Sequence, residues 1–262
     1  MKEALEMWKN TRMVALTALC AALYAALLIP FKAIPLIPGF TEIRPAAAIP
    51  ILTSFMFGPA GAWGSAIGNL IGDFFGTLSA GSLFGFIANF IYGFIPYFVW
   101  SAIKKDADPL PGKISDWILY VMVLFLASAG CGFVVGWGVH ILGFLPFSAL
   151  ANIVTINNFI TSLILTTILL FLLYPRVKNW GILYKNLVPL TDKPGSWRRI
   201  VALVLIFVGV FGGILVGNLI SLGFAGGTLF GPGPHPTSVG SLSLGLSLLP
   251  FFALIILGLI LI

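Results

Sequence analysis

The stretch FMFGPAGAWGSAIGNLIGDFFG, residues 55–76, holds one carboxylate, Asp73, in a run that is otherwise apolar or small except for Ser65 and Asn69. A carboxylate inside lipid is costly and usually faces an interior cavity. Asn69 and Asp73 are four residues apart, so they share a helix face. Glycines recur at spacings of three or four and line one side of the same helix: Gly58, Gly61, Gly64, Gly68, Gly72 and Gly76. This pattern predicts a membrane helix that packs tightly around a ligand or against a sliding neighbour.

Composition sets the class of protein around this helix. Of the 262 residues 59% are hydrophobic and 8% are charged, and the mean hydropathy is +1.08. A water-soluble domain is typically ~25% charged, so we predict an all-α polytopic membrane protein. Eight apolar segments have spanning or near-spanning length: 12–31, 44–57, 59–78, 82–103, 117–140, 150–174, 200–222 and 239–262. The second is short and contains Pro45 and Pro50, which predicts a broken or tilted helix.

The basic residues predict the orientation. With a cytoplasmic N-terminus and eight crossings, twelve of the fourteen Lys and Arg residues fall inside, and only Lys32 and Arg44 fall outside. This asymmetry follows the positive-inside rule and places both termini in the cytoplasm. The charge lies in loops beside helices, so it indicates topology rather than nucleic-acid binding. The polar N-terminus leads into an apolar run too long for a signal peptide, and residues 176–199 form a cytoplasmic loop expected to lie along the headgroups.

Polar side chains from five segments reach one level, the outer half of the membrane. The candidate substrate-binding residues at this level are Glu42, Arg44, Asn69, Asp73, Asn89, Trp137, His140, Asn157 and Asn158. Each asparagine alone also fits a helix–helix hydrogen bond, and Asp73 also fits an ion pair with Arg44 at the interface. The shared depth favours a pocket that opens outward, because scattered structural pairs have no reason to avoid the inner leaflet.

Several kinds of chemistry have no sequence support. There is no GxxxxGK[ST] phosphate loop, no HExxH and no GxSxG, so we expect no ATPase and no enzyme. An intramembrane lipid enzyme using Asp73 and His140 as acid and base would need further groups that the chain does not offer. Cys20 and Cys131 lie in apolar runs without a CxxC pattern, so we expect no metal site, cofactor or disulfide.

Three runs, FTEIRPAAAIP at 40–50, FGPAGAWGSAIGN at 57–69 and GSLFGFIANFIYG at 81–93, carry a resemblance. Their order and spacing resemble the S-component, the substrate-binding membrane subunit, of energy-coupling factor transporters, with a layout closest to the riboflavin-type members. The matching features are the acidic segment from Phe40 to Pro45, the turn Phe57-Gly58-Pro59 and the pair Asn89-Phe90. The resemblance covers residues 11–175.

The resemblance implies a domain organisation and a function. Residues 1–175 would form a six-helix capture bundle, 176–199 a cytoplasmic loop, and 200–262 two further helices that the six-helix pattern lacks. The bundle would bind a vitamin-sized solute from outside with high affinity in a prokaryotic cell membrane, and deliver it to a coupling subunit with two ATPases. Gly68-Asn69 stands where riboflavin-type members often have a basic residue, and Asp73 is added, so a solute with a cationic or amide-rich face is expected instead of riboflavin.

The first helix carries a candidate docking surface. Its small residues form a smooth stripe, of the kind that lets helices approach closely in lipid: Ala15, Ala18, Ala22, Ala25 and Ala26. The resemblance implies that this stripe contacts the coupling subunit, although packing inside the bundle remains an equal alternative. A stand-alone secondary carrier or channel for a small polar solute is the alternative function.

Overall fold

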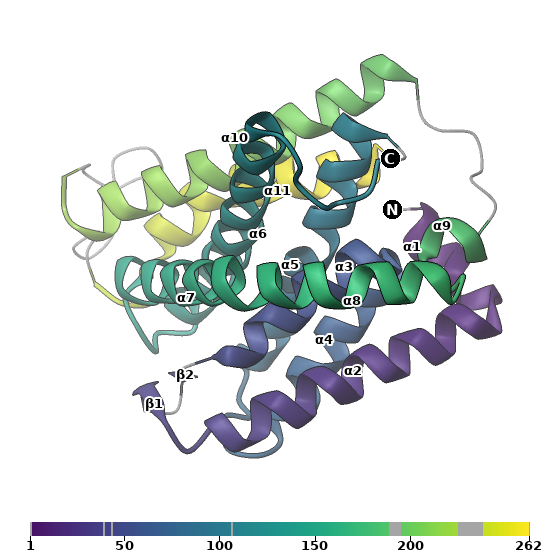
Figure 1. The fold of residues 1–262 in the computed structure, drawn as a ribbon. Helices are drawn as coiled ribbons and strands as arrows, with labels where there is room; N and C mark the ends of the chain where they lie inside the picture. The colour runs from purple at the N-terminus through teal and green to yellow at the C-terminus, as the bar shows by residue number, and fades with distance from the viewer. Residues whose placement is uncertain are drawn as a thin grey trace.

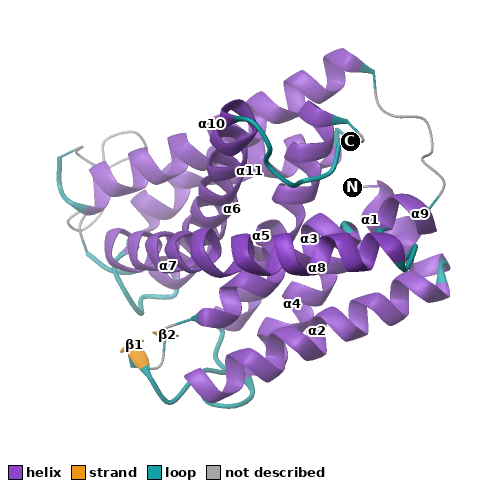
Figure 2. Ribbon diagram, viewed as in Figure 1, coloured by secondary structure: helices purple, strands orange, loops and turns teal. Residues whose placement is uncertain are grey.

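The computed structural model describes residues 2–38, 40–42, 44–105, 107–188, 195–224 and 238–261. Nearly all of this part of the chain is helical, as Figure 2 shows, so the all-α prediction is confirmed. The elements are α1 (Lys2–Glu6), η1 (Met7–Lys9), α2 (Thr11–Phe31), β1 (Pro35–Ile37), β2 (Thr41–Glu42), η2 (Pro45–Ala47), α3 (Ala48–Phe57), α4 (Pro59–Asp73), α5 (Gly81–Lys104), α6 (Ile114–Ile141), α7 (Phe147–Thr161), η3 (Ser162–Thr166), α8 (Thr167–Asn179), α9 (Tyr184–Leu187), α10 (Ser196–Ser221) and α11 (Leu242–Ile260).

The helices run back and forth between two ends of a bundle (Figure 1). We call one end the hairpin end, because it carries the antiparallel strands β1 and β2. The other is the basic end, which carries α1, the 105–113 segment and α9. Within the described residues, six helical stretches are long and apolar enough to cross a membrane: α2, α5, α6, α7 to α9, α10 and α11. The chain is therefore a multi-pass membrane protein.

Two shorter helices, α3 and α4, complete the eight expected segments. They meet at Gly58, whose φ of 54° is a conformation that side chains disfavour, and Pro59 starts α4 at its first turn. The helix expected over 59–78 ends earlier, at Asp73. The helix expected over 150–174 is longer: α7, the π-helical turn η3 and α8 follow one another from Phe147 to Asn179.

Glycines of α4 allow its close contact with α2. A Cβ added at Gly64 would lie 2.4 Å from the Cβ of Cys20, and one added at Gly68 would lie 2.7 Å from the carbonyl oxygen of Ala21. Both are distances that real Cβ atoms do not show, so larger residues would push α2 away. The predicted close packing along this glycine stripe is confirmed for the α2–α4 contact.

The helices α10 and α11 pack on each other and on α6 and α7, on the opposite side of the bundle from α2 (Figure 1). Near the hairpin end the contact is tight. A Cβ at Gly213 or Gly217 of α10 would come within 2.5 Å of an aromatic ring of α6 or α7. The side chains of Asn152 and Asn218 also exchange two hydrogen bonds, of 2.7 and 3.1 Å.

Candidate functional site

The carboxylate of Asp73 lies at the hairpin end of α4, where it is buried at 6% exposure. It receives three contacts: Lys32 Nζ lies 3.1 Å from Oδ1, Thr77 Oγ1 donates to Oδ1 at 2.9 Å, and Asn69 Nδ2 donates to Oδ2 at 3.3 Å. The Lys32 side chain is itself only 7% exposed. A buried charge needs such compensation, so Lys32 at the end of α2 neutralises the acid that the sequence singled out. The sequence suggested Arg44 as a possible ion-pair partner of Asp73, and the structure shows Lys32 in this role.

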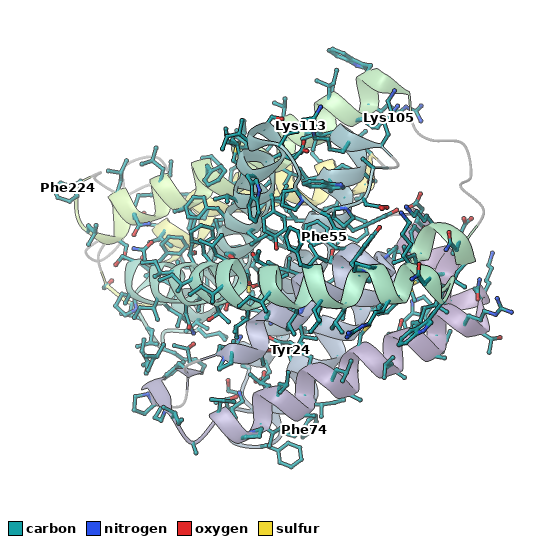
Figure 3. All side chains as sticks on the ribbon, in the orientation of Figure 1. Tyr24, Phe55, Phe74, Lys105, Lys113 and Phe224 are labelled. Atoms are coloured by element: carbon teal, nitrogen blue, oxygen red, sulfur yellow. The ribbon has the colours of Figure 1, made fainter. Side chains whose placement is uncertain are left out.

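One face of α5 continues the site across the bundle. Gly85, Asn89 and Tyr92 recur at spacings of four and three, so they lie along one side of the helix. At Gly85 the absent side chain makes room for Asn69, because an added Cβ would lie 3.1 Å from its Nδ2. Asn89 accepts a 2.9 Å hydrogen bond from the hydroxyl of Tyr24 on α2. Figure 3 shows Tyr24 between α2 and the rest of the bundle.

Tyr92 links this face to the start of α3 and to the π-helical turn. Its hydroxyl donates to the Ala47 carbonyl at 2.9 Å and lies 2.6 Å from Ser162 Oγ. The hydroxyl of Thr166, in the same turn, donates to the Ala48 carbonyl at 3.0 Å. A π-helical turn re-aims side chains relative to a regular helix and often marks a functional site. Here it brings α7 and η3 against the beginning of α3.

The side chain of Asn158 is 1% exposed, and neither its oxygen nor its nitrogen has a hydrogen-bond partner. The thiol of Cys131 lies beside the amide, and Arg44, only 8% exposed, is within electrostatic reach of that thiol. On α4, Asn69 Oδ1 is also buried without a partner. Buried amide groups normally have hydrogen-bond partners. The unpartnered amide atoms of Asn158 and Asn69 are therefore available to bind a ligand inside the protein.

We refer to these residues as the polar cluster: Tyr24, Lys32, Arg44, Asn69, Asp73, Asn89, Tyr92 and Asn158. A pocket of about 410 Å³ lies next to it at the hairpin end, between the hairpin and residues 75–77. Lys32 and Thr77, which both contact Asp73, lie in its wall. The pocket therefore leads from the hairpin end of the bundle to the two side chains that cover the buried carboxylate.

Two of the candidate residues belong to a different contact. Trp137 donates from Nε1 to the Gly245 carbonyl at 3.0 Å, and its ring lies 4.9 Å from that of Phe252, so it faces α11. His140 has the same orientation, because its Nε2 lies 3.2 Å from the hydroxyl of Ser241. The structure therefore places these two side chains against α11, and their assignment to the solute pocket stays a prediction. They lie at the predicted depth, but on the side of α6 that holds the C-terminal helix.

The remaining candidates have less definite positions. Asn157 is half-buried beside Asn158. The side chain of Glu42 lies outside the described part of the chain.

Sequence reasoning missed Tyr24, Lys32 and Tyr92. The signal for the two tyrosines was available, because a buried tyrosine hydroxyl in an apolar helix needs a polar partner.

The alanine stripe of α2 faces out of the bundle. Ala15, Ala18, Ala22 and Ala26 are exposed, whereas the opposite face of α2, with Tyr24, is buried. Ala25 is only 5% exposed and belongs to the buried face, so it is removed from the candidate docking surface. The stripe therefore does not pack inside the described bundle.

The basic end is closed by the N-terminal helix. Glu3 of α1 accepts hydrogen bonds from the hydroxyls of Tyr97 and Tyr184, and Trp63 Nε1 donates to the Ala4 carbonyl at 2.7 Å. Tyr184 is thus buried, whereas Trp180 and Trp197 of the segment expected to lie along the headgroups are exposed. Residues 189–194 of that segment lie outside the described residues.

A buried polar cluster that is reached from one end of a membrane bundle and closed at the other defines a solute-binding membrane protein. Its family is shown by a family model, the QueT transporter, which matches residues 14–175, more than half of the chain. The chain belongs to the QueT transporter family, whose members are S-components of energy-coupling factor transporters. It is thus a membrane transporter subunit for small-molecule uptake that works with an energy-coupling module.

The match confirms the S-component resemblance, and it points to QueT rather than to the riboflavin-type members. It ends at residue 175, so α10 and α11 lie beyond it. Comparison with curated proteins and with solved structures finds no significant match.

Proposed function

We propose that this chain captures a queuosine precursor, the solute of its family, in the polar cluster and passes it to an ATP-driven coupling module. The hairpin end would face outward and the basic end the cytoplasm of a prokaryotic cell, as the distribution of Lys and Arg favours. A queuosine precursor is a flat, purine-like base with amide and amino edges. It therefore has the amide-rich face that the sequence led us to expect.

The observation that carries this proposal is the side chain of Asn158, buried with both polar atoms unused. An amide that pairs with the edge of a base needs both a donor and an acceptor, and Asn158 offers both. Asn69 Oδ1 offers a second free acceptor on α4. A bound base would supply the missing partners, and the protein would recover the cost of burying these groups.

Asp73 would respond to the solute through Lys32. In the described structure the carboxylate already accepts bonds from Lys32, Thr77 and Asn69. A donor group of the solute placed near Asp73 would compete with Lys32, which contacts Asp73 and also lines the pocket at the hairpin end. Lys32 directly follows α2, so a change in its contact with Asp73 on solute binding would also affect α2, the helix that carries the alanine stripe.

Delivery would use that stripe. We propose that Ala15, Ala18, Ala22 and Ala26 contact a transmembrane coupling subunit that is powered by two ATPases. Exposed small residues let another helix approach closely, which is the main route to helix association in lipid. The binding residues lie on the other side of α2, so capture and delivery would use opposite faces of one helix.

The test is solute binding by the purified full-length chain in detergent, measured by isothermal titration calorimetry with a queuosine precursor and with riboflavin as the control ligand. We expect saturable binding of one precursor per chain and no binding of riboflavin. Binding of riboflavin alone would refute the proposed solute, and mass spectrometry of the chain purified from cells would then identify the molecule that occupies the cluster.

One observation favours a second function. The buried Lys32–Asp73 pair is the kind of site that secondary carriers use to couple a solute to a proton or ion. A stand-alone carrier would accumulate solute without any ATPase.

A further inference from the structure

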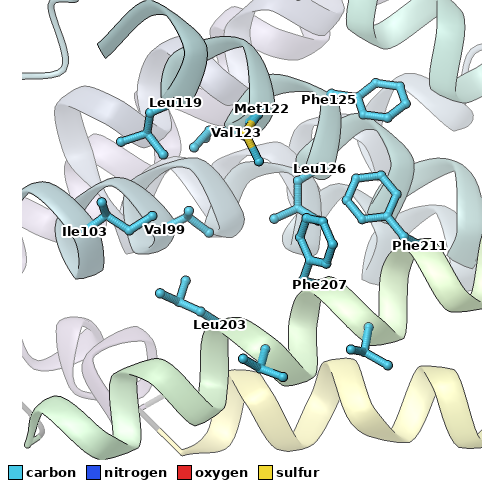
Figure 4. A pocket seen from close by; sticks show the side chains of 12 residues that line it. Val99, Ile103, Leu119, Met122, Val123, Phe125, Leu126, Leu203, Phe207 and Phe211 are labelled. Carbon is cyan, nitrogen blue, oxygen red and sulfur yellow. The ribbon is translucent and has the colours of Figure 1, made fainter. Parts of the chain in front are cut away.

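A second hollow of about 410 Å³ lies between α5, α6 and α10, and its lining is entirely apolar (Figure 4). The lining residues are Val99, Ile103, Leu119, Met122, Val123, Phe125, Leu126, Leu203, Val204, Phe207, Val208 and Phe211. We call this the lateral groove. Its third wall is α10, which lies outside the residues that match the family model.

The groove arises from the way α10 is attached. Near the hairpin end α10 is held against α6 and α7 by glycine contacts and by the Asn152–Asn218 pair. Towards the basic end it faces α5 and α6 with branched and aromatic side chains that do not fill the space between the helices. The rings of Phe125 and Phe211 stack with centroids 5.6 Å apart. This pair closes the groove on the side of the hairpin end. From Leu203 to Phe211 the groove runs along α10 for roughly 12 Å, at 1.5 Å per residue.

The mouth of the groove at the basic end is positively charged. Lys105 follows the lining residue Ile103 by two positions, and Lys113 precedes α6; both are exposed. Figure 3 shows both at the end of the bundle where α10 begins. Arg199 lies one turn before Leu203 on the same face of α10. The described carboxylates nearby are already paired, Asp116 with Lys104 and Asp108 with Lys178 and Lys185.

We propose that the lateral groove binds one anionic phospholipid, with an acyl chain between α5, α6 and α10 and the phosphate near Lys105, Lys113 and Arg199. An apolar lining without a hydrogen-bonding group suits a hydrocarbon chain, and cations at the membrane surface favour anionic headgroups by about 1 kcal/mol each. The lipid would fill the space that the attachment of α10 leaves open. The groove lies away from α2, so the site is separate from solute binding and from the proposed docking surface.

The test is native mass spectrometry of the full-length chain in detergent, titrated with phosphatidylglycerol or with phosphatidylcholine of the same acyl chains. We expect one tightly retained phosphatidylglycerol per chain and weaker retention of phosphatidylcholine. Val204→Trp should abolish retention, because Val204 lines the groove and is 54% exposed, which leaves space for the indole there. Leu215→Trp is the matched control: it lies on the same face of α10, is 61% exposed and does not line the groove.

A second variant tests the headgroup without changing the packing. Lys105→Gln combined with Lys113→Gln should weaken phosphatidylglycerol binding about 25-fold, roughly fivefold for each cation. Lys9→Gln combined with Arg12→Gln removes two exposed cations, one in η1 and one in the first turn of α2, and should leave retention unchanged. Equal retention of both lipids, unchanged retention in Val204→Trp, or a dimer of the chain in place of a lipid adduct would overturn the proposal. None of these readouts depends on the solute.

Discussion

At the scale of single residues, two asparagines separate binding from stability: Asn158, which is buried, and Asn152, which is half-buried. Asn158 has no partner in the described structure, whereas Asn152 is paired with Asn218. Asn158→Leu should therefore leave the thermal stability of the solute-free protein unchanged or slightly raised, because it removes an unpaired polar group. The same variant should weaken solute binding roughly tenfold to more than a hundredfold, for a loss of about 1.5–3 kcal/mol.

Asn152→Leu is the matched control and should show the opposite pattern. It removes both hydrogen bonds to the Asn218 side chain, whose Nδ2 then keeps only the Ile214 carbonyl as acceptor. This loss should lower the free energy of unfolding by about 1–3 kcal/mol while solute affinity is retained. Calorimetric binding and thermal unfolding of both variants provide the comparison. If Asn158→Leu unfolds more easily and binds normally, Asn158 is a structural residue.

Asp73 gives a second prediction at this scale. Asp73→Asn keeps the size of the side chain but removes the charge that Lys32 neutralises, so we expect solute affinity to fall at least tenfold. Lys32→Gln in the same background should restore part of the stability, because it removes the unpaired buried ammonium. Titration of the single and double variants with solute measures both effects, and wild-type affinity in Asp73→Asn would remove this helix from the site.

Asp108, in the segment between α5 and α6, predicts a pH dependence. Burial acts to raise its pKa, but hydrogen bonds from Lys178, Lys185 and Tyr174 outweigh burial and hold the pKa below its ordinary value. A lowered pKa means that the folded protein gains stability from the ionised form above the ordinary value of about 3.9. This gain should be lost as the pH falls through the lowered pKa. Thermal unfolding between pH 6 and pH 3 should show a smaller acid-induced loss in Asp108→Asn, and identical losses would contradict the prediction.

The differences between the expected and the observed site are also found at the scale of single residues. Position along a helix predicted the depth of Asn69, Asn89, Trp137 and His140, but it does not tell which neighbour a side chain faces. Trp137 and His140 face α11 because two further helices cover that side of α6. The Lys32–Asp73 pair was missed because Lys32 was assigned to a loop. Only two cations, Lys32 and Arg44, were predicted on the outer side of the membrane, so either of them was a candidate ion-pair partner for Asp73.

At the scale of elements, the eight apolar segments were predictable because each is an apolar run bounded by polar, glycine or proline residues, and six of them also have the length of a membrane helix. The turn Phe57-Gly58-Pro59 and the glycine stripe of α4 likewise follow from backbone sterics. The π-helical turn η3 could not be predicted, since nothing in SLILT distinguishes it from an α-helix. Its position is set by contacts of Ser162 and Thr166 with the start of α3.

The exposed face of α2 carries the prediction for delivery. Ala22→Trp should leave solute affinity of the isolated chain near wild type, because Ala22 points away from the polar cluster. It should abolish co-purification with the coupling module and ATP-dependent uptake, since the indole keeps a partner helix at a distance. Ala253→Trp, on an exposed position of α11, is the matched control and should preserve both. Normal uptake by Ala22→Trp would place the docking surface elsewhere.

At the scale of the whole molecule, the account requires one orientation in the membrane. Reporter fusions in the 105–113 and 179–183 segments should report a cytoplasmic location, and a fusion at residue 223 an external one. Most of the 223–238 loop lies outside the described residues, but α10 ends at Ser221 at the hairpin end. A cytoplasmic signal at residue 223 would show that α10 does not span.

The central claim is that the chain captures its solute alone and transports it only with an ATP-driven module. The most direct test is uptake of a radiolabelled queuosine precursor into vesicles that contain the chain alone or the chain with its coupling subunit and two ATPases. The account predicts binding without accumulation for the chain alone, under any proton or sodium gradient, and ATP-dependent accumulation with the module. Accumulation by the chain alone would contradict the account and identify a secondary carrier.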